Sequence, residues 1–141
     1  MNNFLDLIFL FLSSFLAATI FPAQSELVLA SLNIADNHDK FLLVAIATTG
    51  NVLGALVNWF IGYYLIKFKN KKWFPIQKRK IDKYSRFYRK WGILSLLLAW
   101  MPIIGDPLTV IAGIFKTNIW LFLTLVTIGK LSRYLLIIFI T

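Results

Sequence analysis

Four long apolar stretches, divided by shorter polar ones, organise this chain. The second and fourth are unbroken and exceed the roughly 20 residues that a helix needs to cross a bilayer. The first and third contain prolines, which remove a backbone donor and kink or end a helix. The pattern predicts an all-α polytopic membrane fold in five parts: a hairpin over about 4–34, a transmembrane helix over 41–68, a connector over 69–91, a hairpin over about 92–116 and a transmembrane helix over 118–141.

The two broken stretches share a short motif: a proline, two further residues, a small residue and an acid. The motif is Pro22, Ser25 and Glu26 in the first stretch, and Pro102, Gly105 and Asp106, followed by Pro107, in the second. This recurrence suggests two copies of one unit. Broken apolar helices in corresponding positions of two halves are typical of a transport site.

Each broken stretch has two arms, the segments before and after its proline motif. The lengths of these arms indicate whether the stretch crosses the membrane or turns back inside it. The arms 92–101 and 108–115 would each measure about 12–15 Å as helices, too short for a hydrocarbon core of about 30 Å, which favours a hairpin. In the first stretch the arm 4–21 would measure roughly 27 Å and the arm 27–34 about 12 Å. A kinked span and a re-entrant hairpin with its tip at 21–26 both remain open there.

Small residues recur every four positions in the second apolar stretch. They are Gly50, Gly54, Asn58 and Gly62. Because this spacing puts them on one face of a helix and small residues let helix backbones approach closely, they predict a helix-packing face.

Composition places the chain in the membrane class. Its 141 residues are 59% hydrophobic, and its mean hydropathy is +0.74. That is too apolar for a soluble domain of this length, and there is room for one domain only. Cysteine is absent, which excludes disulfides and thiolate metal sites. The first six residues contain an acid and no basic residue, so no signal peptide is expected.

Positive charge is concentrated in one segment. The net charge is +9, and eleven of the fifteen Lys and Arg lie between Lys67 and Lys90. Short basic loops stay in the cytoplasm, so the connector is predicted to be cytoplasmic. A nucleic-acid partner is not expected, because long apolar stretches flank the basic segment. The turn 33–40 carries little positive charge, which fits the outer face, and its His38 is expected to be a solvated loop residue.

The second part of the connector has helical spacing. Ile81, Tyr84, Tyr88 and Trp91 share one side, and Lys and Arg occupy the others. This predicts an amphipathic helix lying in the membrane interface, with its cations toward anionic headgroups.

Four charged residues fall deep within the apolar stretches. Glu26 and Asp106 lie at the proline motifs, and Lys130 and Arg133 lie inside the last helix. A cation at mid-membrane costs about 2.5–3.5 kcal/mol on insertion scales, so acids must compensate it. We therefore expect all four to meet in one polar cluster. Either the cluster only fixes helix register, or its cations bind an anionic headgroup while its carboxyls change protonation.

The rival functions differ in what would cross the membrane. An enzyme is not expected, because the sequence contains no Ser/His/Asp set, metal-ligand spacing or phosphate-cradling glycine loop. Neither a cofactor nor a metal site is expected. An ion or small-solute channel and a non-transporting scaffold remain alternatives to a transporter. The sequence leaves the oligomeric state open, a homo-oligomer included.

At these motifs the chain resembles the DedA superfamily of membrane proteins (the SNARE-associated or VTT domain), and within it the short YqaA-like branch. The matching stretches are FPAQSE (21–26), GNVLGALVNWFIGYYL (50–65), YRKWG (88–92), WMPIIGDPLTVIAG (100–113) and GKLSRYL (129–135). The resemblance implies two re-entrant hairpins facing each other in an inverted repeat, in the bacterial inner (cell) membrane. It also implies a flippase or scramblase for undecaprenyl phosphate or phospholipids that depends on the proton-motive force.

The chain departs from the family pattern at the tip of the second hairpin, around Pro102. Many members carry arginines beside the tip proline, whereas this chain has Trp100 before it and Asp106 after it. An anion-binding role would therefore fall to Lys130 and Arg133.

Overall fold

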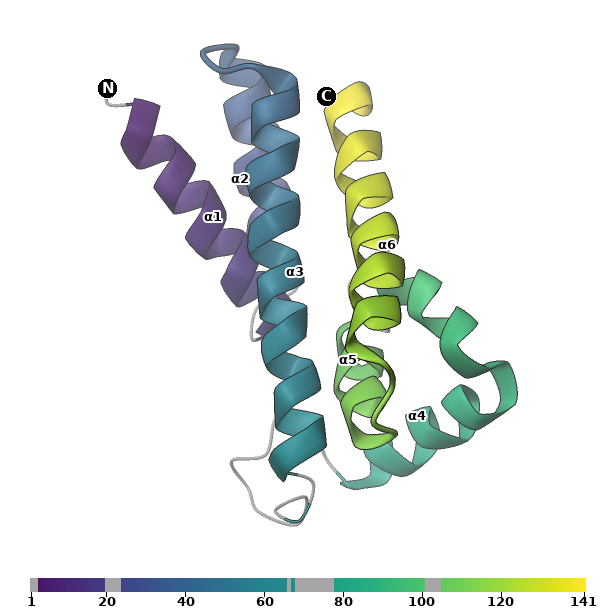
Figure 1. Ribbon diagram of the computed structural model, residues 1–141. Coiled ribbons are helices and arrows are strands. Elements are labelled where there is room, and N and C mark those ends of the chain that lie inside the picture. The colour runs from purple at the N-terminus through teal and green to yellow at the C-terminus, as the bar shows by residue number, and fades with distance from the viewer. Residues whose placement is uncertain (1–2, 20–23, 66, 68–77, 101–104) are drawn as a thin grey trace.

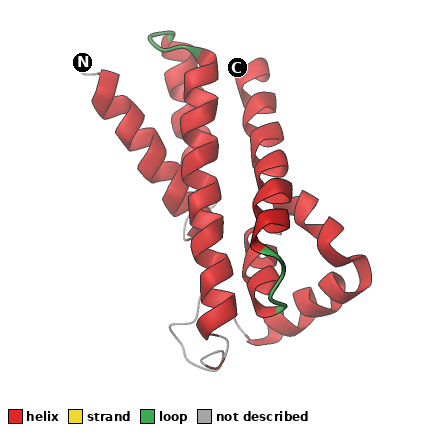
Figure 2. Cartoon of the chain, in the orientation of Figure 1, coloured by secondary structure: helices red, strands yellow, loops and turns green. Residues whose placement is uncertain are grey.

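A computed structural model describes residues 3–19, 24–65, 67, 78–100 and 105–141 of the chain. In chain order the elements are α1 (Asn3–Thr19), α2 (Gln24–Ala35), α3 (Lys40–Leu65), α4 (Lys78–Trp91), the 3-10 helix η2 (Gly92–Trp100), α5 (Gly105–Ile114) and α6 (Ile119–Ile140). Figure 2 shows helices joined by short loops over the described residues, which confirms the prediction of an all-helical fold.

Two long helices form the frame of the molecule. α3 and α6 stand side by side, and α1 and α2 lie along the end that carries both termini (Figure 1). η2 and α5 lie at the other end, and α4 runs across that end at a steep angle to the frame. The basic helix α4 and the two termini are therefore at opposite ends of the protein.

The frame helices are the two elements with the length and composition of a membrane span. They cover Lys40–Tyr64 (25 residues) and Ile119–Ile140 (22 residues). These correspond to the transmembrane helices expected at 41–68 and 118–141, although residues 66 and 68 lie outside the described part. The other apolar helices are shorter, with 17 residues in α1, 12 in α2 and 10 in α5.

The helices that follow the proline motifs begin earlier than the arms expected from sequence. α2 begins at Gln24 rather than 27, and α5 begins at Gly105 rather than 108. Both acids of the motif consequently lie in a first helical turn, where a carboxylate is favoured by the helix dipole. Pro107 is tolerated there because the first-turn amides lack intrahelical partners.

The small residues of α3 permit backbone-to-backbone packing along its whole length. A Cβ added at Gly54 would lie 2.5 Å from the Phe15 carbonyl oxygen of α1, and one at Gly62 would lie 2.1 Å from the Val110 carbonyl oxygen of α5. Gly50 meets α1 in the same way. α3 therefore packs against the first hairpin with one half and against the second with the other.

Asn58 lies on α3 between these two backbone contacts. Its Nδ2 donates to the Ala18 carbonyl oxygen at 2.8 Å and to Thr109 Oγ1 at 3.1 Å. One amide side chain, 4% exposed, thereby ties the end of α1 to the beginning of α5.

The amphipathic helix expected at the end of the connector is α4, whereas 69–77 lie outside the described residues. Ile81 and Tyr88 are buried, but Trp91 is exposed. Tyr88 stacks on Phe115 with ring centroids 5.1 Å apart, and its hydroxyl lies 2.5 Å from Thr117 Oγ1. Burial raises the pKa of Tyr88 more than the Thr117 hydrogen bond lowers it, so its hydroxyl stays neutral.

Gly92 makes the turn from α4 into η2. Its φ of +66° lies in the left-handed region, which glycine adopts without a Cβ clash. The first arm of the second hairpin then continues as a 3-10 helix.

His38 is not the solvated loop residue expected from the sequence. Its side chain is only 3% exposed, and its Nε2 lies 3.7 Å from Oδ2 of Asp6 in α1. The turn between α2 and α3 folds over the first hairpin, which shields the imidazole from solvent. A local polar sequence could not reveal this contact because the two residues are 32 positions apart.

The glycine contact of α3 provides a test of the packing. We expect Gly54→Val to lower stability by about 1–3 kcal/mol, since its Cβ would overlap the α1 backbone and helices cannot shift locally. Thermal unfolding of the detergent-solubilised protein measures this. Leu53→Val, on the exposed face of the same helix, is the control and should change stability little. Equal stability of the two variants would contradict the close contact.

Candidate functional site

Two cations on α6 form the core of the candidate site. Lys130 has no exposed surface and Arg133 is 7% exposed. They are three residues apart, so they lie on one side of the helix within one turn. Asn118 fixes the start of α6, because its side chain accepts hydrogen bonds from the backbone N–H groups of Trp120 and Leu121.

Each cation is paired with the acid of a different helix, Lys130 with the acid of α5 and Arg133 with the acid of α2. Lys130 Nζ lies 2.8 Å from Asp106 Oδ1, and Arg133 Nη2 lies 2.5 Å from Glu26 Oε1. The four charges balance, and Lys130 is also within electrostatic range of Glu26 and Arg133. The structure therefore places the four residues singled out from the sequence side by side, as two neighbouring ion pairs.

The acids are less buried than their partners. Exposure is 15% for the Asp106 side chain and 31% for the Glu26 side chain, against 0% for Lys130 and 6% for Arg133. The carboxylates therefore form the accessible rim of the cluster. An incoming anion would meet the carboxylates first and would have to displace one of them to reach its cation.

Two helices begin beside this cluster. Glu26 is in the first turn of α2 and Asp106 is in the first turn of α5. The N-terminal end of a helix carries partial positive charge and free N–H groups, which favour anions. The cluster thus combines two cations with two positive helix ends around two removable carboxylates.

Hydroxyl groups fix the two helix beginnings. Ser25 Oγ lies 2.7 Å from Tyr134 Oη, a buried contact that joins α2 to α6. Thr109 Oγ1 donates to the Asp106 carbonyl oxygen at 2.6 Å. The Ser25 contact therefore ties the first turn of α2 to α6, whereas the Thr109 bond lies within the beginning of α5.

The remaining motif residues have varied places. Ser25 is buried, Pro107 lies in the first turn of α5, and Gly105 begins that helix. Pro22 and Pro102 lie outside the described residues. The tips themselves are therefore known only from the helices that enter and leave them.

Tyr134 and Thr109 were not among the residues chosen from the sequence. Tyr134 is fully buried and Thr109 is also 0% exposed. Thr109 follows Asp106 by three positions, a helical spacing that could have indicated the contact. Tyr134 gives no local signal, because its partner Ser25 is 109 positions away. Among the described residues, no group of three or more acids and histidines is arranged to hold a metal ion.

The fold and the buried charge cluster together define a helical integral membrane protein. Comparison with known proteins gives the family. The VTT domain matches residues 6–141. The chain is 35% identical over 136 residues to the inner membrane protein YqaA of Escherichia coli, covering 95% of this chain and 89% of that protein.

Two further relatives cover as much of the chain. A Haemophilus influenzae protein with the name "Uncharacterized protein" is 33% identical over 143 residues, which are 96% of this chain and 87% of that protein. The protein RP436 of Rickettsia prowazekii is 24% identical over 136 residues, 95% of each chain. No solved structure matches.

The chain belongs to the VTT-domain (DedA) family, as the motifs indicated. It is an integral membrane protein, and the inner-membrane localisation expected from sequence agrees with the name of the Escherichia coli relative.

The Lys130–Asp106 pair can be tested by a double-mutant cycle. We expect Lys130→Met or Asp106→Leu alone to cost about 3–5 kcal/mol, because each leaves one charge without its partner in a buried site. The double variant should lose much less than the sum of the two. Thermal unfolding in detergent measures the coupling, with Lys80→Met on exposed α4 as the control. Additive losses would show that the two side chains do not interact.

Proposed function

We propose that this protein moves a phosphate-bearing lipid across the membrane, as a flippase or scramblase, with the ion-pair cluster as its central site. The observation that carries the proposal is a pair of buried cations held by acids from two separate hairpins. A phosphate group can replace a carboxylate beside Arg133, since guanidinium binds either in a forked geometry. Undecaprenyl phosphate and phospholipids are the candidate substrates.

We further propose that the two helical pairs are re-entrant and related as an inverted repeat. α2 and α5 would measure roughly 18 Å and 15 Å, well short of a core of about 30 Å. The contacts of the arms support the inversion. The first arms α1 and η2 pack on the next long helix of the chain, α3 and α6 respectively, whereas α5 contacts α3 and α2 contacts both α6 and α3.

Proton coupling follows from the same arrangement. If the carboxyl of Glu26 or Asp106 takes up a proton, its cation loses a partner and becomes available to an anion. Release of the anion would restore the ion pair and expel the proton. The partial exposure of both acids supports such access. The cluster would then alternate between an acid-bound and a phosphate-bound state.

Lipid movement in liposomes tests the function. We expect Glu26→Gln and Asp106→Asn each to reduce the initial rate by about tenfold or more while membrane insertion is retained, because a neutral amide cannot exchange a proton. Fluorescent phospholipid or polyprenyl phosphate, quenched from outside, reports the rate. Asp36→Asn in the exposed turn is the matched control, since asparagine tolerates its left-handed backbone.

The outcomes separate the candidate functions. Full activity in both neutral variants would exclude the proton role. Ion flux without lipid movement would indicate a channel, and neither activity would indicate a scaffold.

Membrane topology tests the re-entrant arrangement independently. We expect both termini outside and the basic connector in the cytoplasm, because two spans and two returning hairpins put the termini opposite α4. Reporter enzymes that are active on only one side, fused at either terminus, measure this. If both broken segments crossed the bilayer, both termini would lie inside with the connector.

A further inference from the structure

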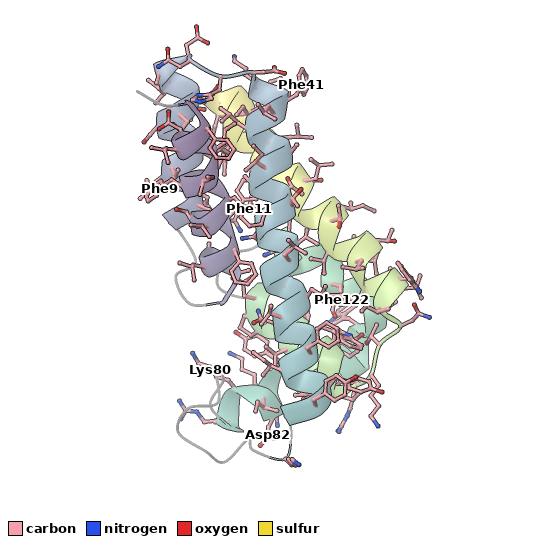
Figure 3. The ribbon with its side chains drawn as sticks, turned by 60° about the vertical axis from the view of Figure 1, so that its left-hand side comes forward. Phe9, Phe11, Phe41, Lys80, Asp82 and Phe122 are labelled. Atoms are coloured by element: carbon pink, nitrogen blue, oxygen red, sulfur yellow. The ribbon has the colours of Figure 1, made fainter. Side chains whose placement is uncertain are left out.

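A second basic site lies at the opposite end of α5 from the ion-pair cluster. A pocket of about 520 Å³ opens between α4 and the end of α5. Its polar lining comes from α4, and its apolar wall is formed by Ile114 and Phe115 beside Ile81. Figure 3 shows Asp82, one of the lining residues, at the end of the molecule far from Phe41.

The polar lining has the composition of an anion site. Arg86 and Arg89 provide two guanidinium groups from one turn of α4, and Ser85 adds a hydroxyl. Among the described lining residues Asp82 is the one acid, which leaves these residues a net charge of +1. No ion pair within 4.0 Å joins Asp82 to either arginine in this described part of the chain. Among the described residues, neither guanidinium group therefore forms an ion pair with the acid that lines the pocket.

Arg89 is positioned by contact with an aromatic ring, which does not neutralise its charge. The Arg89 guanidinium carbon lies 5.6 Å from the centroid of the Phe115 ring, within cation–π distance. Phe115 is fixed in turn by its stacking on Tyr88. This positions a planar fork of N–H donors at the pocket wall, and such forks match the geometry of phosphate oxygens.

We propose that this pocket binds a phosphate group carried by a lipid at the membrane surface on the α4 side. The apolar wall beside the arginines suits the glycerol and acyl base of a lipid, which free phosphate lacks. The site does not depend on lipid movement through the central cluster. Binding in this pocket differs from the general attraction of a basic helix to a membrane, because it depends on Arg86 and Arg89 and not on the other cations of α4.

The other cations of α4 supply the matched control. Arg79 and Lys80 are exposed on the same helix and do not line the pocket. Removing them takes away the same charge as removing Arg86 and Arg89. General electrostatic attraction predicts equal losses for the two double variants, whereas a pocket predicts unequal ones.

Binding is measured on the purified full chain in phosphatidylcholine nanodiscs, with short-chain phosphatidic acid as the probe and inorganic phosphate as the second arm. We expect Arg86→Gln/Arg89→Gln to weaken phosphatidic acid binding about tenfold or more, and Arg79→Gln/Lys80→Gln less than about twofold. Asp82→Asn should tighten binding several-fold, because it removes the one acid from the lining. Inorganic phosphate should bind more weakly and follow the same order of variants.

Three results would overturn the site. These are equal losses in both double variants, no change in Asp82→Asn, and binding of inorganic phosphate without binding of phosphatidic acid. Thermal unfolding checks that each variant is folded, which these surface positions should allow. Lipid movement by the unaltered protein in liposomes tests the central transport site, whereas the difference in phosphatidic acid binding between the two double variants tests this pocket, so failure of the one is distinguishable from failure of the other.

Discussion

A lysine side chain without exposed surface imposes the main constraint on this protein. Lys130 lies midway along α6, where no water can solvate its ammonium group, and Arg133 follows one turn later. Moving such charges out of water costs several kcal/mol each unless a partner is close. The partners come from two segments that are 80 residues apart in the chain. The charge requirement of one helix thereby determines where both hairpins must end.

The glycine-spaced face of α3 makes that meeting sterically possible. Gly54 admits the α1 backbone and Gly62 admits the α5 backbone, and each lets a hairpin approach the frame more closely than a larger residue would. Asn58 then donates hydrogen bonds to both α1 and α5 between these two contacts. Packing on α3 and ion pairing on α6 therefore support the same arrangement from two sides, and neither helix could hold the hairpins alone.

The arrangement of two ion pairs suits a binding site that must open to exchange one anion for another. Ion pairs in a buried position are costly to break when one partner is removed, yet they can be exchanged for another anion without a net loss of partners. The partial exposure of Glu26 and Asp106 puts the exchangeable groups at the rim, while the cations stay within the protein. The basic pocket on α4 lies apart from this cluster, and Arg86 and Arg89 line it. The two sites differ in composition: each cation of the cluster is paired with an acid, whereas the described lining of the α4 pocket has two arginines and one acid.

The amino-acid sequence by itself determined the helical membrane class, the two long apolar helices, the amphipathic α4 and the four charged residues within apolar stretches, because hydropathy, proline and charge act locally or within one helical period. Tertiary structure alone decided which acid pairs with which cation, since the order of Glu26 and Asp106 along the chain does not fix their approach to α6. It also decided the shielding of His38 by contact with Asp6 and the bond between Ser25 and Tyr134. These contacts join residues far apart in the sequence, and their geometry exists only when whole helices are packed against one another.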